Sequence, residues 1–85
     1  MKEIRFTPHA KMKFEILKRH NFVVLEEEVK GVILKPEKRE IGRKGREIAQ
    51  KTISERHILR VIYEEKDRGI EVITFYPARR ERYED

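Results

Sequence analysis

The chain has 85 residues, a length that allows one domain and no more. Of these residues 38% are apolar and 44% charged, and the net charge is +5. The chain has no cysteine, which excludes a disulfide framework and thiolate metal sites. No apolar run could span a bilayer, and the opening MKEIRFTPHA lacks the apolar stretch of a signal peptide, so we expect a cytoplasmic protein without a membrane partner.

The positive charge predicts a negatively charged partner, either a nucleic acid or an acidic protein, because Coulomb attraction steers such partners together. The alternative is that the charge serves only solubility. Abundant Lys, Glu and Arg beside few Asn and Gln are also typical of thermophile proteins.

The first residues, MKEIRF, alternate and predict a short strand. Thr7 is a predicted helix N-cap with Pro8 at the first helical position, so we expect a helix over Pro8 to Arg19. The residues expected to face the core are Ala10, Phe14 and Leu17, with Met12 and Ile16 widening the stripe.

A second helix is predicted from about Val24 to Leu34, ending before Pro36. Its expected core residues are Leu25, Val29, Val32 and Ile33, and its first turn carries Glu26, Glu27 and Glu28. The short connection between the helices predicts a helical hairpin.

From Lys38 onward the pattern changes to that of strands. KREIGRKGREI indicates a hairpin or loop, and EIAQKTIS, RHILRVIYEE and GIEVITFY are strand candidates, the last two joined by the turn KDRG. The expected order is therefore β–α–α–β–β–β(–β). The predicted fold class is α+β, with two layers: an N-terminal helical hairpin packed on a three- to four-stranded antiparallel sheet.

The chain ends in TFYPARRERYED. Pro77 cannot donate a backbone hydrogen bond, so we expect the strand to end there or to reach an edge of the sheet, and a basic tail follows. Arginine binds phosphate oxygens bidentately, and tyrosine can stack on a base or move a proton. The tail therefore predicts nucleic-acid binding, with a solvated tail as the alternative.

The helix start at Thr7, His9 and Ala10, the RVIYEE and VITFYPAR strands and the basic tail resemble the RelE/ParE superfamily of type II toxins. The likeness is to its small BrnT-like members and to related small RelE-like domains, and it covers most of the chain in element order. It implies a RelE-like fold and an endoribonuclease that cleaves mRNA, free or on the ribosome, without metal or other cofactor. It also implies a partner antitoxin that holds the enzyme inactive.

In such enzymes the ribose 2′-OH attacks the adjacent phosphodiester, so the site needs a base, an acid and cations. The resemblance carries over Arg79 and Arg80 as catalytic residues and extends to Tyr83 as a further catalytic residue and to Arg82 as an RNA-binding one. Tyr76 is a further candidate, as an acid, a base or a stacking ring.

The remaining candidates come from the expected sheet and the helix start. Arg60 lies on a central strand and could face the site, or could be a structural arginine bonded to Glu71. His57, three residues earlier, is expected on the opposite face unless the strand begins irregularly. His9, in the first helical turn, could act as a neutral base or could be a surface or capping residue.

Further basic residues are candidates for binding the RNA backbone. Arg43, Lys44 and Arg46 could do so or could simply form a solvated hairpin tip, and Lys51, on the other side of the sheet, could supply a second cation. The histidines lack metal-ligand spacing, so no metal site is expected. Two other functions stay open: a non-catalytic RNA- or protein-binding module of the same fold, and a ParE-like toxin directed at gyrase.

Overall fold

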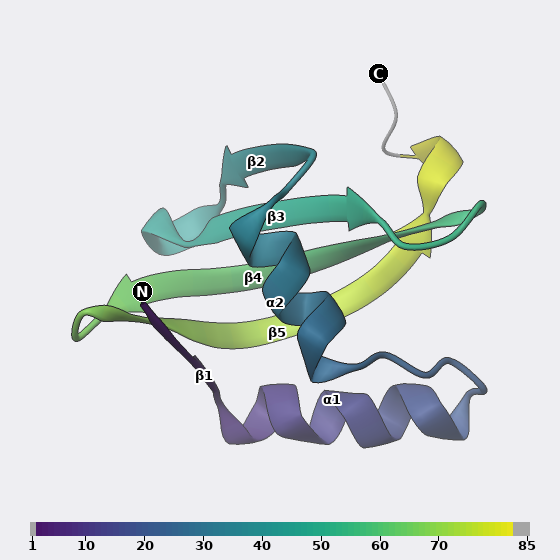
Figure 1. Cartoon of the computed structure of the whole chain (residues 1–85), viewed down its shortest axis with the longest axis horizontal. Coiled ribbons are helices and arrows are strands. Elements are labelled where there is room, and N and C mark those ends of the chain that lie inside the picture. Colours follow the sequence, from purple (N-terminus) through teal and green to yellow (C-terminus); the bar gives the residue numbers. More distant parts are fainter. Residues whose placement is uncertain (1, 83–85) are drawn as a thin grey trace.

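A computed structural model describes residues 2–82 of the chain (Figure 1). In chain order the elements are β1 (Glu3–Phe6), α1 (Pro8–Arg19), α2 (Glu26–Leu34), β2 (Lys38–Ile41), the short helical turn η1 (Arg43–Gly45), β3 (Glu47–Thr52), β4 (His57–Lys66), β5 (Gly69–Arg79) and the helical turn η2 (Arg80–Arg82). The α+β class and the expected element order are confirmed.

The sheet differs from the predicted one. Within residues 2–82 it has five strands in the order β1-β5-β4-β3-β2, and it is mixed, because β1 runs parallel to β5 while the other pairs are antiparallel. The prediction of a three- to four-stranded antiparallel sheet was therefore wrong. Alternation along a strand shows which side chains share a face but not which neighbour the strand takes, and the two helices carry the chain from one edge of the sheet to the other.

The predicted helical hairpin was also wrong. Both helices cover the same face of the sheet, but α1 lies against β5 and β1, whereas α2 lies against β4 and β3 and runs in a different direction (Figure 1). Each helix buries its own apolar stripe on its own pair of strands, so neither needs the other as a packing partner.

The start of α1 follows the prediction. The Thr7 hydroxyl accepts a hydrogen bond from the Ala10 N–H at 3.1 Å and donates one to the Ile73 carbonyl at 3.1 Å, which fixes the helix start to β5. Met12 and Ile16 do not widen the buried stripe, since they are 63% and 39% exposed. Met12 lies about 200° around the helix from Ala10, on the side facing away from the sheet.

The second helix begins at Glu26 rather than Val24, and Leu25 is its N-cap residue in extended conformation. The Leu25 side chain is 56% exposed, so its expected place in the core was wrong. Its N–H donates to the Glu28 carboxylate at 2.9 Å, which explains why the helix starts there. Val24 instead reaches the core from the connection between the helices.

The core lies between the helices and the sheet. Leu59 and Val61 of β4 and Val72 and Phe75 of β5 are fully buried on this face. The alternate residues of β4, such as Arg60, point to the other face, which no helix among residues 2–82 covers. None of the helices in this part of the chain has both the length and the apolarity to cross a membrane.

Candidate functional site

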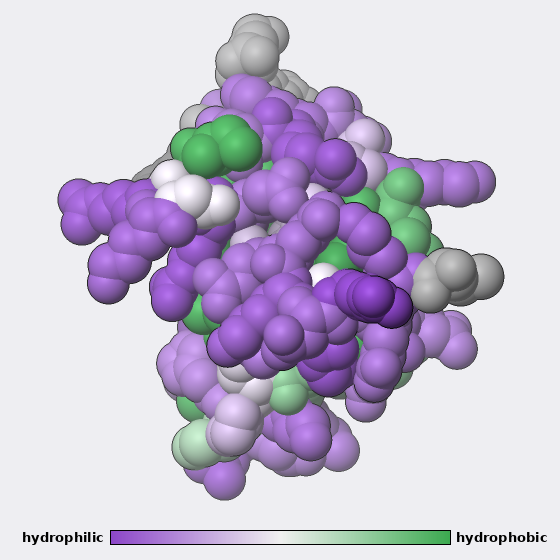
Figure 2. All heavy atoms as spheres, turned by 90° about the vertical axis from the view of Figure 1, so that its left-hand side faces the viewer, coloured by the Kyte–Doolittle hydropathy of each residue, from purple (hydrophilic) through white to green (hydrophobic). Residues whose placement is uncertain are grey.

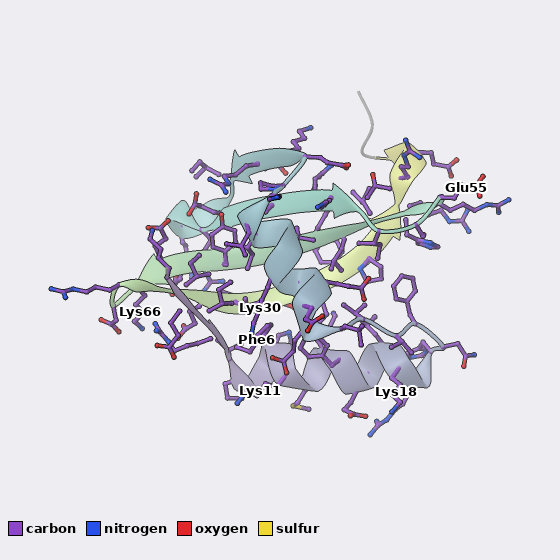
Figure 3. The ribbon with its side chains drawn as sticks, viewed as in Figure 1. Phe6, Lys11, Lys18, Lys30, Glu55 and Lys66 are labelled. Atoms are coloured by element: carbon purple, nitrogen blue, oxygen red, sulfur yellow. The ribbon has the colours of Figure 1, made fainter. Side chains whose placement is uncertain are left out.

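A pocket of about 410 Å³ lies where the β3–β4 connection meets the end of β5. We call it the terminal pocket; its lining residues are Glu55, Arg56, His57, Arg79, Arg80 and Glu81. Figure 3 labels Glu55 at this end of the sheet and Lys66 at the opposite end. The volume is within the range of small-molecule sites and would hold a phosphate group with part of a nucleotide.

Backbone pairing brings the two walls of the pocket together. His57, the first residue of β4, lies opposite Arg79, the last residue of β5. Beyond this pair the Arg80 N–H donates to the Arg56 carbonyl at 2.9 Å. The turn before β4 is closed by the His57 carbonyl, which accepts from the N–H groups of Ile53 and Ser54. The sheet itself thus sets the spacing between the imidazole and the arginines.

The His57 ring is half-buried and held on two sides. It packs edge-to-face with the ring of Phe22 from the connection between the helices, with ring centroids 5.2 Å apart and an angle of 80° between the planes. Its Nδ1 lies 3.4 Å from the Ser54 hydroxyl oxygen. A histidine held in this way keeps a defined orientation, which proton transfer requires.

The pocket is positively charged, because three arginines face two glutamates. Arg79 Nη1 lies 3.8 Å from a Glu81 carboxylate oxygen, but both side chains are more than 70% exposed. An exposed ion pair of this kind is weak, so an entering phosphate can compete with Glu81 for the guanidinium.

The structure therefore brings together three of the predicted catalytic residues: His57, Arg79 and Arg80. Arg82 follows them in η2, where only its backbone is described, and Tyr83 lies outside the described residues. Glu55, Arg56 and Glu81 were missed. They flank His57 and the arginines in the sequence, so a search for charged residues next to the expected strand ends would have found them.

Arg60 lies elsewhere, on the sheet face opposite His57, as the spacing along β4 predicted. It is 7% exposed. Its guanidinium donates to the Tyr76 hydroxyl at 3.0 Å, the Gln50 side-chain oxygen at 2.6 Å and a Glu40 carboxylate oxygen at 2.7 Å. Burial disfavours its charge, but the hydrogen bonds to Glu40 and Tyr76 outweigh burial and raise the pKa of Arg60 above its ordinary value.

This network favours the structural alternative for Arg60 but corrects the expected partner. Glu71 pairs across the strands with Glu64 and Arg5, whereas Tyr76 lies opposite Arg60. β5 continues to Arg79, so its position relative to β4 places Glu71 nearer the other end of the sheet. Tyr76, bonded to Arg60, also lies outside the terminal pocket.

The other basic candidates are dispersed. Arg43, Lys44 and Arg46 lie at or beside η1, which adjoins the start of β3 and thus the far end of β4. This end of the molecule has a largely hydrophilic surface with small, separate hydrophobic patches (Figure 2). Lys51 is half-buried near the pocket end of β3, opposite Leu59. His9 is exposed in the first turn of α1 and does not line the pocket.

Comparison of the chain with protein-family models, with curated proteins and with solved structures finds no match. The resemblance to RelE/ParE toxins therefore stays a prediction, and the case for a function depends on the residues of the terminal pocket. Within residues 2–82, no three His, Cys, Asp or Glu side chains gather in a group that could hold a metal ion.

Proposed function

We propose that this protein is a metal-independent endoribonuclease whose active site is the terminal pocket. The observation that carries the proposal is the convergence of His57, Arg79 and Arg80 on one pocket of about 410 Å³. An imidazole beside several guanidinium groups is what cleavage of a phosphodiester through the 2′-OH requires, because the reaction moves two protons and increases negative charge on phosphorus.

The proposed reaction assigns these tasks within the pocket. One of the two carboxylates, Glu55 or Glu81, takes the proton from the ribose 2′-OH as its oxygen bonds to phosphorus. The bond from phosphorus to the 5′-oxygen then breaks, and His57 gives that oxygen its proton. Arg79 and Arg80 stabilise the charge on the phosphoryl oxygens. The products are a 2′,3′-cyclic phosphate and a 5′-hydroxyl end.

The physiological role we propose is that of the toxin in a type II toxin–antitoxin system, acting on mRNA, free or on the ribosome. The excess of arginine in the pocket supports a partner antitoxin with an acidic segment, since opposite charge favours fast association. Such a segment laid over the pocket would displace RNA.

A second candidate function is RNA binding without cleavage. One observation favours it: the tyrosine expected to join the site, Tyr76, bonds to Arg60 on the other face of the sheet, so the pocket has a single histidine and no described tyrosine. In that case the arginines would bind phosphate, and the pocket would not position an acid and a base to cleave it.

The deciding experiment incubates the purified protein with labelled single-stranded RNA in excess EDTA, with and without ribosomes. We expect fragments ending in 2′,3′-cyclic phosphate. His57→Gln should lower the rate on the order of a thousandfold while RNA affinity is kept. His9→Gln is the matched control, since His9 is exposed and away from the pocket, and it should cleave at the native rate.

Two other results would change the assignment. RNA binding that responds to salt, without cleavage in either condition, would support the binding module instead. Cleavage that His57→Gln leaves unchanged would mean that the activity does not belong to the terminal pocket.

A further inference from the structure

The two edge strands of the sheet, β1 and β2, differ in whether they can pair with themselves. An edge strand presents backbone N–H and C=O groups that can join another strand. Two copies related by a twofold axis would pair such strands antiparallel, with one residue opposite its own counterpart in the other copy. The residues on either side then oppose each other in turn, and like charges directly opposite each other are unfavourable.

The direction of the backbone groups of β1 follows from its junction with α1. The Thr7 N–H donates to the Val72 carbonyl of β5 at 3.1 Å. Backbone groups alternate along a strand, so those of Arg5 and Glu3 also point toward β5. Those of Ile4 and Phe6 therefore point toward the outer edge, where a further strand could bind.

A pairing of two β1 strands centred on Ile4 places outward backbone groups at its centre and sets no like charges opposite each other. Ile4 lies opposite Ile4 of the second copy, and their outward backbone groups can exchange two hydrogen bonds. Glu3 then lies opposite Arg5 of the second copy, and the reciprocal pair forms on the other side of the axis. Pairings centred on Glu3 or on Arg5 would instead place like charges together.

The β2 edge does not have this property. Centring on Lys38, Arg39 or Glu40 places each of these residues opposite its own copy, so that like charges meet. Centring on Ile41 pairs no other residue of β2, because the strand ends at Ile41 and Arg43 already lies in η1. A self-pairing of β2 therefore either places like charges opposite each other or pairs a single residue, and charge on an edge strand is a common way to avoid association.

We propose that two copies of this chain associate through their β1 strands about a twofold axis at Ile4, forming one sheet across both copies. The Glu3 and Arg5 side chains are accessible, at 74% and 33% exposure, and their contact with each other within one chain is loose, at 3.8 Å. Association replaces this contact with pairs between the copies. The strand is short and each copy carries a charge of +5, so the dimer is weak, with a Kd on the order of 100 µM.

This association does not depend on the proposed ribonuclease activity. Glu3 pairs with Gly69, at the start of β5, whereas the terminal pocket lies at its end. The two ends are far apart along the strand (Figure 1). Both pockets stay open in the dimer, at opposite ends of the joined sheet.

The test measures association of the full chain by sedimentation equilibrium over a range of concentrations. Glu3→Arg should weaken association about tenfold, because two attractive pairs become repulsive. Arg5→Glu should do the same. The double variant Glu3→Arg/Arg5→Glu exchanges the charges and should restore association to near the native level. Lys38→Glu, on the β2 edge, is the control and should leave the Kd unchanged.

Arg5 also donates to the Lys66 carbonyl, so its replacement could disturb the fold, and each variant is checked by circular dichroism. If Arg5→Glu unfolds, the result for Glu3→Arg alone decides the test. A native chain that stays monomeric up to about 1 mM would overturn the proposal. So would association that Glu3→Arg leaves unchanged, because the contact would then lie elsewhere.

Discussion

Two groups of arginines in this small domain have opposite surroundings. Arg60, in the middle of β4, is buried and donates to Gln50, Glu40 and Tyr76. Arg79 and Arg80, at the end of β5, are exposed and border a pocket. In the sequence all three are arginines in or just beyond a β-rich run. Their difference comes from the strands beside them, which supply partners to one and an open edge to the others.

The comparison distinguishes a charge that the fold holds in place from the charges on which the proposed function depends. A buried guanidinium bonded to acceptors on three other strands cannot turn to a ligand without leaving those acceptors unpaired, which costs free energy. At the sheet end, Arg79 forms an exposed ion pair with Glu81 at 3.8 Å, which is weak and can give way to a ligand. An RNA phosphate is therefore expected to bind there rather than at Arg60.

The largest expected effect is on stability. Arg60→Ala should lower the free energy of unfolding by about 2–3 kcal/mol, because the buried Gln50 loses its partner and the packing around the buried Arg60 side chain is lost. Arg79→Ala should change it by about 0.5 kcal/mol or less. Urea unfolding of both variants measures the difference. A stable Arg60→Ala protein that no longer binds RNA would reverse the comparison.

A smaller effect is expected on RNA binding. Arg79→Ala/Arg80→Ala should weaken affinity for single-stranded RNA by about tenfold and reduce the dependence of log K on log salt by roughly 0.7 for each arginine. The matched control replaces Arg43 and Lys44, which are exposed at the opposite end of the sheet. We expect a smaller loss there, and equal losses would show that RNA contacts the whole basic surface rather than the pocket.

Much of the local structure could be predicted from the sequence, because its signals are local. Thr7-Pro8 sets the start of α1, and the KDRG turn joins β4 to β5, as expected. The place of β1 could not be predicted, since a four-residue strand alternates in the same way whichever neighbour it takes. For the same reason the Arg60 partners were missed: Glu40 is 20 residues away in the sequence, and the pairing of β2, β3 and β4 brings it near.

The candidate site was predicted in part. His57 and the arginines were identified by residue type, but the choice between Arg60 and His57 as site residues needed the structure. The alternation of side chains along β4 placed His57 and Arg60 on opposite faces of the sheet, but it did not show which face has a pocket. That depends on the junction of the β3–β4 connection with η2, where the Arg80 N–H meets the Arg56 carbonyl.

The smallest expected effect concerns Glu37, which precedes β2 and joins it to the pocket end of β3. Its carboxylate accepts hydrogen bonds from the Thr52 N–H and hydroxyl, both at 2.8 Å. The bond from the Thr52 backbone, followed by that from its hydroxyl, lowers the pKa of Glu37 below its ordinary value, and Lys51 and Arg80 act in the same direction. A lowered pKa in the folded state means that the charged carboxylate stabilises the fold above the ordinary Glu pKa, and that this contribution is lost as the pH falls through the lowered value.

Glu37→Gln keeps an acceptor oxygen and removes the charge. At neutral pH the variant should therefore be less stable than the native chain, by only about 0.5 kcal/mol because the group is exposed. The difference should shrink as the pH falls below the ordinary Glu pKa, because the native carboxyl then becomes protonated as well. Urea unfolding of both proteins at neutral and at acidic pH measures it. A difference that is the same at both values would show that Glu37 acts through its shape and hydrogen bonds rather than its charge, and that the arginine and lysine at this end of the sheet do not interact with it.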